Sequence, residues 1–145
     1  MRTLHNISSI MIKDHLRLLS LLYVFEQVDD FDVNDKISSF DALKWNLEKH
    51  IFTEEKVVFT SFNAEEKEEQ YNLFLEISKE HTAILNELAV IKNQLYRKIP
   101  YDGFRLREQL IKHQKYEEQV LYPRLDKELT KEEKCFILDR IKEII

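Results

Sequence analysis

The sequence predicts an all-α protein, an antiparallel up-down-up-down four-helix bundle with an additional short C-terminal helix. The first observation is that the 145-residue chain contains one Gly and two Pro. Sandwiches, barrels and doubly wound folds turn at many glycines, because their turns need residues at positive φ, and this chain cannot supply them. The second observation is that apolar residues recur at alternating steps of three and four, the spacing of one helix face. The third is that short connections separate the periodic segments, which makes neighbouring helices antiparallel.

Breaks in this periodicity divide the chain into five helical segments, which we expect to form one domain over residues 1–145. The segments span about 8–28, 35–60, 64–98, 103–122 and 131–144. Two segment starts have a capping residue with a glutamate three positions later, which satisfies free N–H groups of a first helical turn. These pairs are Asn63 with Glu66 and Thr130 with Glu133. We expect the short fifth segment to dock across one end of the bundle.

Each of the four long segments has one seam of mainly apolar residues that faces the bundle axis. In the first segment the seam is Met11, His15, Leu18, Leu22 and Phe25. In the second it is Phe40, Leu43, Leu47, His50, Glu54 and Val57. In the third it is Phe74, Ile77, His81, Ile84, Leu88, Ile91 and Leu95. In the fourth it is Leu106, Leu110, His113, Glu117 and Val120. Every seam therefore has a histidine near its middle, and two seams have a glutamate one turn later.

Composition excludes several classes of partner. The net charge of −5 and the pI near 5.6 lack the basic surface that nucleic acid binding requires. The first apolar stretch is interrupted by charged residues such as Lys13 and Arg17, so it predicts no membrane span. One cysteine, Cys135, cannot form an internal disulfide, which fits a reducing cytosol. We expect a cytoplasmic monomer or homodimer without nucleic acid or membrane partners.

The polar residues on the seams need partners, because a buried polar group without one costs roughly 1 to 3 kcal/mol. Any one of the histidines, taken alone, is better explained as a core histidine bonded to a carbonyl or a carboxylate. Four imidazoles and two carboxylates on the seams together make coincidence a poor explanation. This donor set suits Fe, Mn, Zn or Cu, and bridging carboxylates hold two ions about 3.5 to 4 Å apart.

An internal repeat surrounds these residues. The segment 49–55 aligns with the segment 112–118, and both read Lys-His-x-x-x-Glu-Glu. The pair Asp14-His15 is repeated more loosely by Glu80-His81. The chain therefore reads as two helical hairpins of similar design, and a pseudo-twofold bundle brings all six seam groups to one level.

These motifs resemble those of hemerythrin-like proteins, the HHE cation-binding family. The matching residues are His15 in Asp-His-Leu-Arg-Leu, His50 and Glu54 in His-Ile-Phe-Thr-Glu-Glu, His81 in Glu-His-Thr-Ala-Ile, and His113 and Glu117 in His-Gln-Lys-Tyr-Glu-Glu-x-x-Leu-Tyr-Pro. The resemblance covers about residues 8–127, and the order, spacing and flanking residues agree.

The resemblance implies a four-helix bundle around a non-heme di-iron centre that binds O2 or a related small ligand such as NO. The two Fe ions would be bridged by an oxo or hydroxo group and by carboxylates. The implied ligands are His15 and His50 for one iron and His81 and His113 for the other, with Glu54 and Glu117 bridging both. Zn or Mn can replace iron in such a site, because the order of affinities does not select iron.

Two features depart from the oxygen-carrying members. Those proteins have a fifth histidine ligand from a His-x-x-x-His pair on the third helix, whereas Ile77 and Leu85 stand at that spacing from His81. Two octahedral ions with one oxygen bridge then keep about one open position each. The carriers also place the last carboxylate five residues after its histidine, where this chain has Glu118. The seam favours Glu117, and Glu118 is the alternative ligand.

The pattern favours a protein that captures O2 or NO, in sensing, storage or iron and redox homeostasis, over an enzyme. A di-iron enzyme with peroxidase, oxidase or NO-reducing activity is the alternative, because each metal keeps an open position. A metal-free helical interaction module is the third possibility.

Several further residues are left outside the metal site. Asp14 and Glu80 either hydrogen-bond an imidazole N–H or lie on a solvated helix face. Five aromatic residues are interpreted as core filling: Tyr23, Phe25, Trp45, Phe59 and Tyr122. Cys135 is interpreted as a small buried hydrophobic residue, and His5 lies outside the first seam.

Overall fold

The computed structural model describes residues 6–28, 32–61 and 68–145, and every regular element in these ranges is a helix. The helices are α1 (Ile7–Gln27), α2 (Val33–Thr53), α3 (Phe59–Ser61), α4 (Glu68–Tyr96), α5 (Phe104–Tyr116), α6 (Tyr122–Glu128) and α7 (Lys131–Ile144). Two π-helical turns, η1 (Glu54–Val58) and η3 (Glu117–Leu121), join α2 to α3 and α5 to α6 without a break. The all-α prediction is confirmed.

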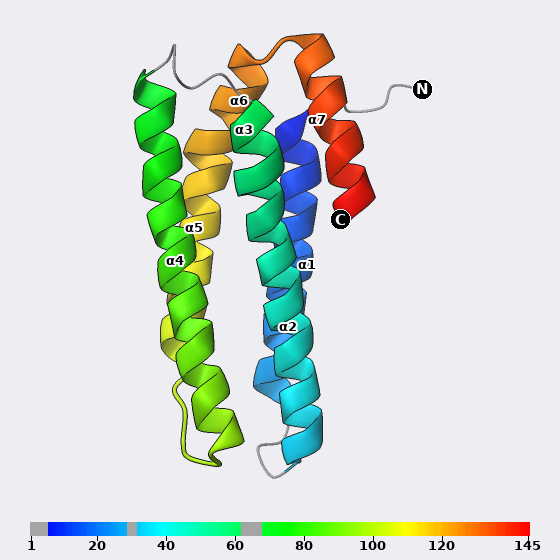
Figure 1. Ribbon diagram of the computed structural model, residues 1–145. Helices are drawn as coiled ribbons and strands as arrows, with labels where there is room; N and C mark the ends of the chain where they lie inside the picture. The colour runs from blue at the N-terminus through cyan, green and yellow to red at the C-terminus, as the bar shows by residue number, and fades with distance from the viewer. Residues whose placement is uncertain (1–5, 29–31, 62–67) are drawn as a thin grey trace.

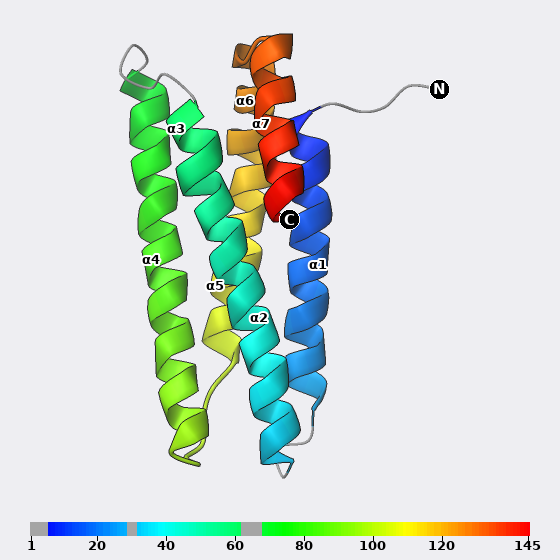
Figure 2. The same ribbon diagram turned by 45° about the vertical axis from the view of Figure 1, so that its right-hand side comes forward.

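Four long rods form an antiparallel bundle (Figure 1). The rods are α1, the continuous α2-η1-α3, α4, and the continuous α5-η3-α6. The short helix α7 turns back at one end and contacts α1, α2 and η1, as the rotated view in Figure 2 also shows. The predicted bundle with an extra C-terminal helix is confirmed. However, α7 lies along the side of the bundle near one end and does not cross that end.

The fourth rod is longer than its periodicity predicts. We expected a break around residues 123–130, but the helix continues through Pro123 to Glu128. In a regular α-helix the proline ring collides with the carbonyl of residue i−4, and a backbone hydrogen bond is lost. Here the wider turn η3 comes first, and the N–H of Tyr122 bonds the carbonyl of Glu117 five residues back. The wide turn lets the rod include the proline.

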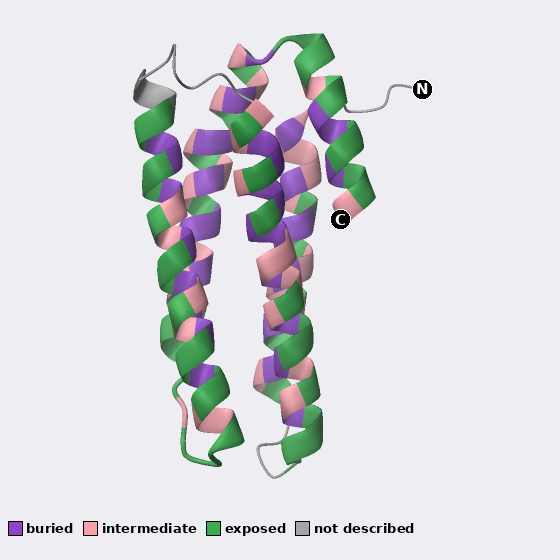
Figure 3. Ribbon diagram, viewed as in Figure 1, coloured by how far each residue is buried: buried purple, intermediate pink, exposed green. Residues whose placement is uncertain are grey.

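Two apolar clusters fill the two halves of the bundle, and buried residues line the inner face of each rod (Figure 3). The cluster on the α7 side contains residues from every rod and three from α7, among them Met11, Val57, Ile77, Leu121, Ile137, Leu138 and Ile141. The far cluster contains Leu18, Leu47, Ile84 and Leu110. On every rod, the polar seam residues lie between a residue of one cluster and a residue of the other. The candidate site is therefore enclosed by apolar packing at both ends.

The two π-helical turns change which residues face the bundle axis. Each turn begins at a seam glutamate, Glu54 or Glu117, and a π-turn adds one residue to a helical turn. After η3, Leu121 and Tyr122 are both buried, whereas Val120, a predicted seam residue, is half-buried. This shift of register turns Tyr122 toward the axis.

The beginnings of α1 and α7 are closed by side-chain caps. Asn6 accepts a hydrogen bond from the N–H of Ser9, and the carboxylate of Asp126 accepts from the N–H groups of Ile7 (2.6 Å) and Ser8 (3.0 Å). The hydroxyl of Ser8 also donates to Asp126 (2.7 Å), so the fourth rod holds the start of the first.

The predicted capping box at α7 is confirmed. The hydroxyl of Thr130 accepts from the N–H of Glu133, and the Glu133 carboxylate accepts from the N–H of Thr130. The pair Asn63 and Glu66 lies outside the described residues. Among the described helices, none is both long and apolar enough to cross a membrane.

Replacing Asp126 by Ala is expected to lower the free energy of unfolding by about 1 to 2 kcal/mol, because two backbone N–H groups of α1 lose a charged acceptor. Urea denaturation measures this loss. The control is Asp139→Ala, a change at an exposed aspartate of α7, which should stay within about 0.5 kcal/mol of the unchanged protein. Equal stability of the two variants would show that the cap contributes nothing.

Candidate metal centre

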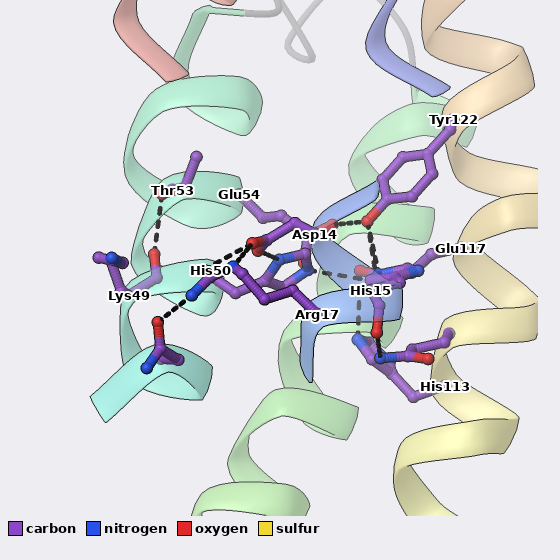
Figure 4. Close-up of polar contacts among 12 residues, drawn as sticks. Asp14, His15, Arg17, Lys49, His50, Thr53, Glu54, His113, Glu117 and Tyr122 are labelled. Carbon is purple, nitrogen blue, oxygen red and sulfur yellow. Dashed lines mark hydrogen bonds and ion pairs between the residues drawn. The ribbon is translucent and has the colours of Figure 1, made fainter. Parts of the chain in front are cut away.

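The histidines and glutamates of the four seams meet at mid-height of the bundle. They are His15 from α1, His50 and Glu54 from the second rod, His81 from α4, and His113 and Glu117 from the fourth rod. Each of them is at most 5% exposed. In Figure 4, the side chains of His15, His50, Glu54, His113 and Glu117 point toward one another. The structure thus brings together all the residues that the sequence predicts as ligands.

Every one of these imidazoles has a carboxylate on its outer nitrogen, Nδ1. The pairs are His15 with Glu118 (2.7 Å), His50 with Asp14 (2.6 Å), His81 with Glu55 (2.5 Å) and His113 with Glu80 (2.6 Å). An ionised carboxylate offers only acceptors, so Nδ1 carries a proton and donates it. The inward nitrogen, Nε2, is therefore the atom left to bind a metal, which is the usual arrangement of metal-ligating histidines.

The internal repeat of the sequence is also a repeat in these outer contacts. Glu55 and Glu118 occupy equivalent repeat positions, and each binds the histidine of another rod. Asp14 and Glu80 are equivalent as well, and each binds the histidine of the rod beside it. Of the two alternatives for Asp14 and Glu80, the structure shows the hydrogen bond to an imidazole. Glu118 lies on the outer side of the cluster, and Glu117 is the inner carboxylate that the seam predicts.

The Glu117 carboxylate lies between two pairs of imidazoles. Its Oε1 atom is 2.9 Å from Nε2 of His15 and 3.8 Å from Nε2 of His50. Its Oε2 atom is 3.2 Å from Nε2 of His113 and 3.6 Å from Nε2 of His81. Each oxygen of this carboxylate therefore faces a different pair.

The Glu54 carboxylate has a related position. Its Oε1 atom is 3.1 Å from Nε2 of His81 and 3.3 Å from Nε2 of His50, so it also lies between members of the two pairs. Its Oε2 atom accepts a hydrogen bond of 2.7 Å from the hydroxyl of Tyr122.

Three polar atoms inside the cluster make no hydrogen bond with any described residue. They are Nε2 of His50, Nε2 of His113 and Oε2 of Glu117. Buried polar atoms of native proteins are nearly always bonded, and an unbonded group costs about 1 to 3 kcal/mol. Once deprotonated, these atoms offer lone pairs that face one another, which is the arrangement a cation between them would satisfy. The residues present therefore fit a metal ion.

Potential ligand atoms fall into two groups, each with all its members within 4.8 Å of one another. One group is Glu54, His81, His113 and Glu117, and the other is His15, His50 and Glu117. Glu117 belongs to both. The chain therefore has a buried His/Glu cluster that suits a metal centre.

The charges of the cluster depend on one another. Burial by itself lowers the pKa of an imidazole, but Glu117 and Glu54 beside His81 raise its pKa to about 11. Burial is likewise outweighed at His113, where Glu117 raises the pKa to about 9. Burial would raise the pKa of Glu117, yet the surrounding imidazoles hold that pKa well below its ordinary value. Without a metal, protons held by the imidazoles balance the negative charge of the carboxylates.

Tyr122 is the site residue that the sequence interpretation missed. It is buried, as expected of a core residue, but its hydroxyl lies 3.0 Å from Nε2 of His15, 2.7 Å from Oε2 of Glu54 and 3.0 Å from Oε1 of Glu117. Burial and the two carboxylates raise its pKa well above the ordinary value. The regular seam spacing selects Val120 and does not include Tyr122. Only the register shift at η3 turns Tyr122 toward the cluster.

The other residues that the sequence assigns to the core differ in their burial. Phe25 is buried in the core as predicted, whereas Tyr23, Trp45 and Cys135 are exposed. His5 lies outside the described residues. At the positions where a fifth histidine could stand, Ile77 is fully buried in the α7-side cluster and Leu85 is half-buried.

A small cavity of about 10 Å³ adjoins the cluster on the side away from Tyr122. Its lining consists of the four imidazoles, one amide and five aliphatic side chains: His15, His50, His81, His113, Gln114, Leu18, Leu47, Ile51, Ile84 and Leu110. This volume is about that of one water-sized sphere. A molecule of a few atoms is the largest guest that the cavity can receive without movement of side chains.

A family model described as the hemerythrin HHE cation binding domain matches residues 6–125. The matched range contains every histidine and glutamate of the cluster and ends within α6. No curated protein and no solved structure matches the chain significantly.

Loading the metal-free protein with Zn²⁺ at pH 7 is expected to release about two protons or more. His81 and His113, with pKa values of about 11 and 9, hold protons that a metal must displace. The affinity for Zn²⁺ should therefore rise with pH between about 6 and 9. Calorimetric titration in buffers of different ionisation enthalpy counts the protons. A binding heat that is independent of the buffer, with a flat pH profile, would contradict this.

Replacing Asp14 by Asn should weaken metal binding about tenfold to a hundredfold, because the amide does not match the carboxylate that orients His50. Competition with a chromophoric Zn²⁺ chelator measures the affinity. Asp41→Asn, at an exposed position of the same bundle, is the matched control and should bind as the unchanged protein does. Equal affinities of the two variants would remove Asp14 from the support of the site.

Proposed function

The chain belongs to the hemerythrin HHE cation-binding family, and on that premise we propose that its buried cluster holds two iron ions and captures O2 or a related diatomic such as NO. The observation that carries the proposal is the Glu117 carboxylate, whose two oxygens face two different imidazole pairs. A carboxylate so placed suits two ions held side by side. The role is then oxygen or NO sensing, storage, or iron and redox homeostasis.

The proposed ligands follow the two groups of atoms. His15 and His50 serve one ion, His81 and His113 serve the other, and Glu54 and Glu117 lie between the two. Iron supplies reversible one-electron chemistry toward a small ligand at an open coordination position. Four imidazoles with two inner carboxylates suit Fe, Mn or Zn better than Mg or Ca. The small number of anionic ligands favours reversible binding over oxidation of iron.

The remaining residues of the site orient the ligands and exclude water. The outer carboxylates hold each imidazole with Nε2 inward, so the donor atoms are positioned before a metal arrives. The aliphatic walls of the adjoining cavity, such as Leu18 and Leu110, disfavour water and charged molecules. A cavity of this size supports a diatomic ligand in preference to an organic substrate.

A di-iron enzyme that acts on O2, NO or peroxide is the second candidate. The cavity beside the imidazoles limits its substrate to molecules of that size. A metal-free interaction module is disfavoured, because such a module would keep three buried polar atoms without hydrogen bonds.

Metal analysis with an absorption spectrum of aerobically purified protein tests the proposal. We expect about two irons per chain and near-ultraviolet bands of an oxo bridge, and reduced protein should bind NO or O2 reversibly. Glu117→Ala should lose both ions, because its carboxylate serves both groups, and His50→Ala should lose at least one. Glu48→Ala changes a partly exposed carboxylate on α2 that pairs with Lys44, and this control should keep both irons.

Two results would decide against parts of this function. Absence of iron after anaerobic loading with Fe²⁺ would refute the di-iron proposal. Two bound irons with steady consumption of reductant under O2 would instead establish the enzyme.

A further inference from the structure

The two groups of potential ligands are unequal. The group around His81 and His113 has four histidine or carboxylate ligands, and the group around His15 and His50 has three. Glu54 belongs to the first group only, although its Oε1 atom also lies 3.3 Å from Nε2 of His50. A tyrosine, Tyr122, lies beside the three-membered group.

Among the described residues, the hydroxyl of Tyr122 forms hydrogen bonds with three atoms that face the cluster. It is 3.0 Å from Nε2 of His15, 3.0 Å from Oε1 of Glu117 and 2.7 Å from Oε2 of Glu54. Its single proton can be donated to one of these atoms. When Nδ1 of His15 donates to Glu118 and Nε2 is unprotonated, all three neighbours are acceptors. A cation among the oxygens and the nitrogen satisfies the contacts that one proton cannot.

The spacing of these atoms is that of neighbouring corners in a coordination sphere. Ligand atoms at about 2.0 to 2.1 Å from a metal lie about 2.8 to 3.0 Å apart when they occupy adjacent octahedral positions. The distances of the Tyr122 oxygen to His15 Nε2 and Glu117 Oε1 are both 3.0 Å. The hydroxyl is therefore spaced from both atoms as a ligand of the same ion would be.

We propose that Tyr122 is a ligand of the ion held by His15, His50 and Glu117. The proposal rests on the proposed function, since it assigns one more ligand to the same centre. When the ion binds, the O–H bond breaks, the phenolate oxygen bonds to the metal, and the proton passes to solvent. Tyr122 thus adds one protein ligand to the three-membered group.

This assignment changes which metal remains open. With octahedral ions and one oxygen bridge, four imidazoles and two bridging carboxylates keep about one open position on each metal. A Tyr122 ligand fills the open coordination position of the ion beside His15. The ion beside His81 and His113 then retains its open position. Tyr122 belongs to the α7-side cluster, whereas aliphatic residues of the far cluster line the small cavity. The phenolate therefore closes the side opposite the cavity, and a small ligand enters from the cavity side.

The spectrum of the iron-loaded protein tests this ligand. A phenolate bound to Fe(III) produces a charge-transfer band in the visible range, and resonance Raman excitation in that band shows phenolate vibrations. We expect both signals in the unchanged protein, which needs no variant. Tyr122→Phe keeps the ring packing and should keep two irons and the near-ultraviolet bands but lose the visible band. Tyr116→Phe removes a hydroxyl of α5 that donates to Glu76 at the surface, and this control should keep the visible band.

Titration of the reduced protein with NO provides a second readout. The unchanged protein and Tyr116→Phe should bind about one NO per pair of irons, and Tyr122→Phe should bind about two. Two irons with no phenolate vibrations, and equal NO counts in all three proteins, would overturn the ligand role and make Tyr122 a hydrogen-bond donor only. Failure of the unchanged protein to hold two irons would instead refute the di-iron function.

Discussion

The structure depends on one electrostatic constraint, which is that several ionisable groups are buried together in the middle of an apolar bundle. Removing an ion from water costs several kcal/mol even after relaxation, unless opposite charges and hydrogen bonds compensate. Here each imidazole lies between an outer carboxylate on Nδ1 and an inner carboxylate near Nε2. The pKa of His81 is raised and that of Glu117 is lowered by this mutual contact, so protons occupy the cluster until a metal replaces them.

The fold meets this constraint by placing the polar residues of all four rods at one level of the bundle. Apolar clusters lie on both sides of the polar layer, and α7 adds three aliphatic residues to one of them. Both seam glutamates start a π-helical turn, a feature that is often found at functional sites. The same turn that follows Glu117 moves Tyr122 onto the axis. The site and the irregular helices therefore have a common origin in the two repeated His-x-x-x-Glu-Glu segments.

Much of this arrangement is predictable from the sequence. Helical periodicity places His15, His50, His81 and His113 on inward seams, and the repeat relates the two halves of the site. Periodicity assumes a constant residue count per turn, however, and π-turns violate that assumption. For this reason the seam selects Val120 and misses Tyr122, and the helix is expected to stop before Pro123.

The hydrogen bonds of the outer carboxylates are not predictable from the sequence, for a different reason. Whether Asp14 and Glu80 face an imidazole or solvent depends on the distance between neighbouring rods, which one helix pattern does not contain. In the structure both carboxylates form hydrogen bonds with an imidazole. The structure also separates Glu117 from Glu118, because neighbouring residues on the wide turn reach opposite sides of a histidine ring: Oε1 of Glu117 faces Nε2 of His15, and Oε2 of Glu118 binds Nδ1.

The central claim is that the cluster holds two metal ions that share carboxylates. X-ray absorption at the iron edge of the loaded protein tests it most directly, because the fine structure reports both the ligand atoms and any neighbouring iron. The account predicts a shell of nitrogen and oxygen ligands together with an iron–iron distance of about 3.5 to 4 Å, or less where an oxygen bridges the pair. A spectrum with light-atom ligands and no iron–iron scattering would contradict a dinuclear centre.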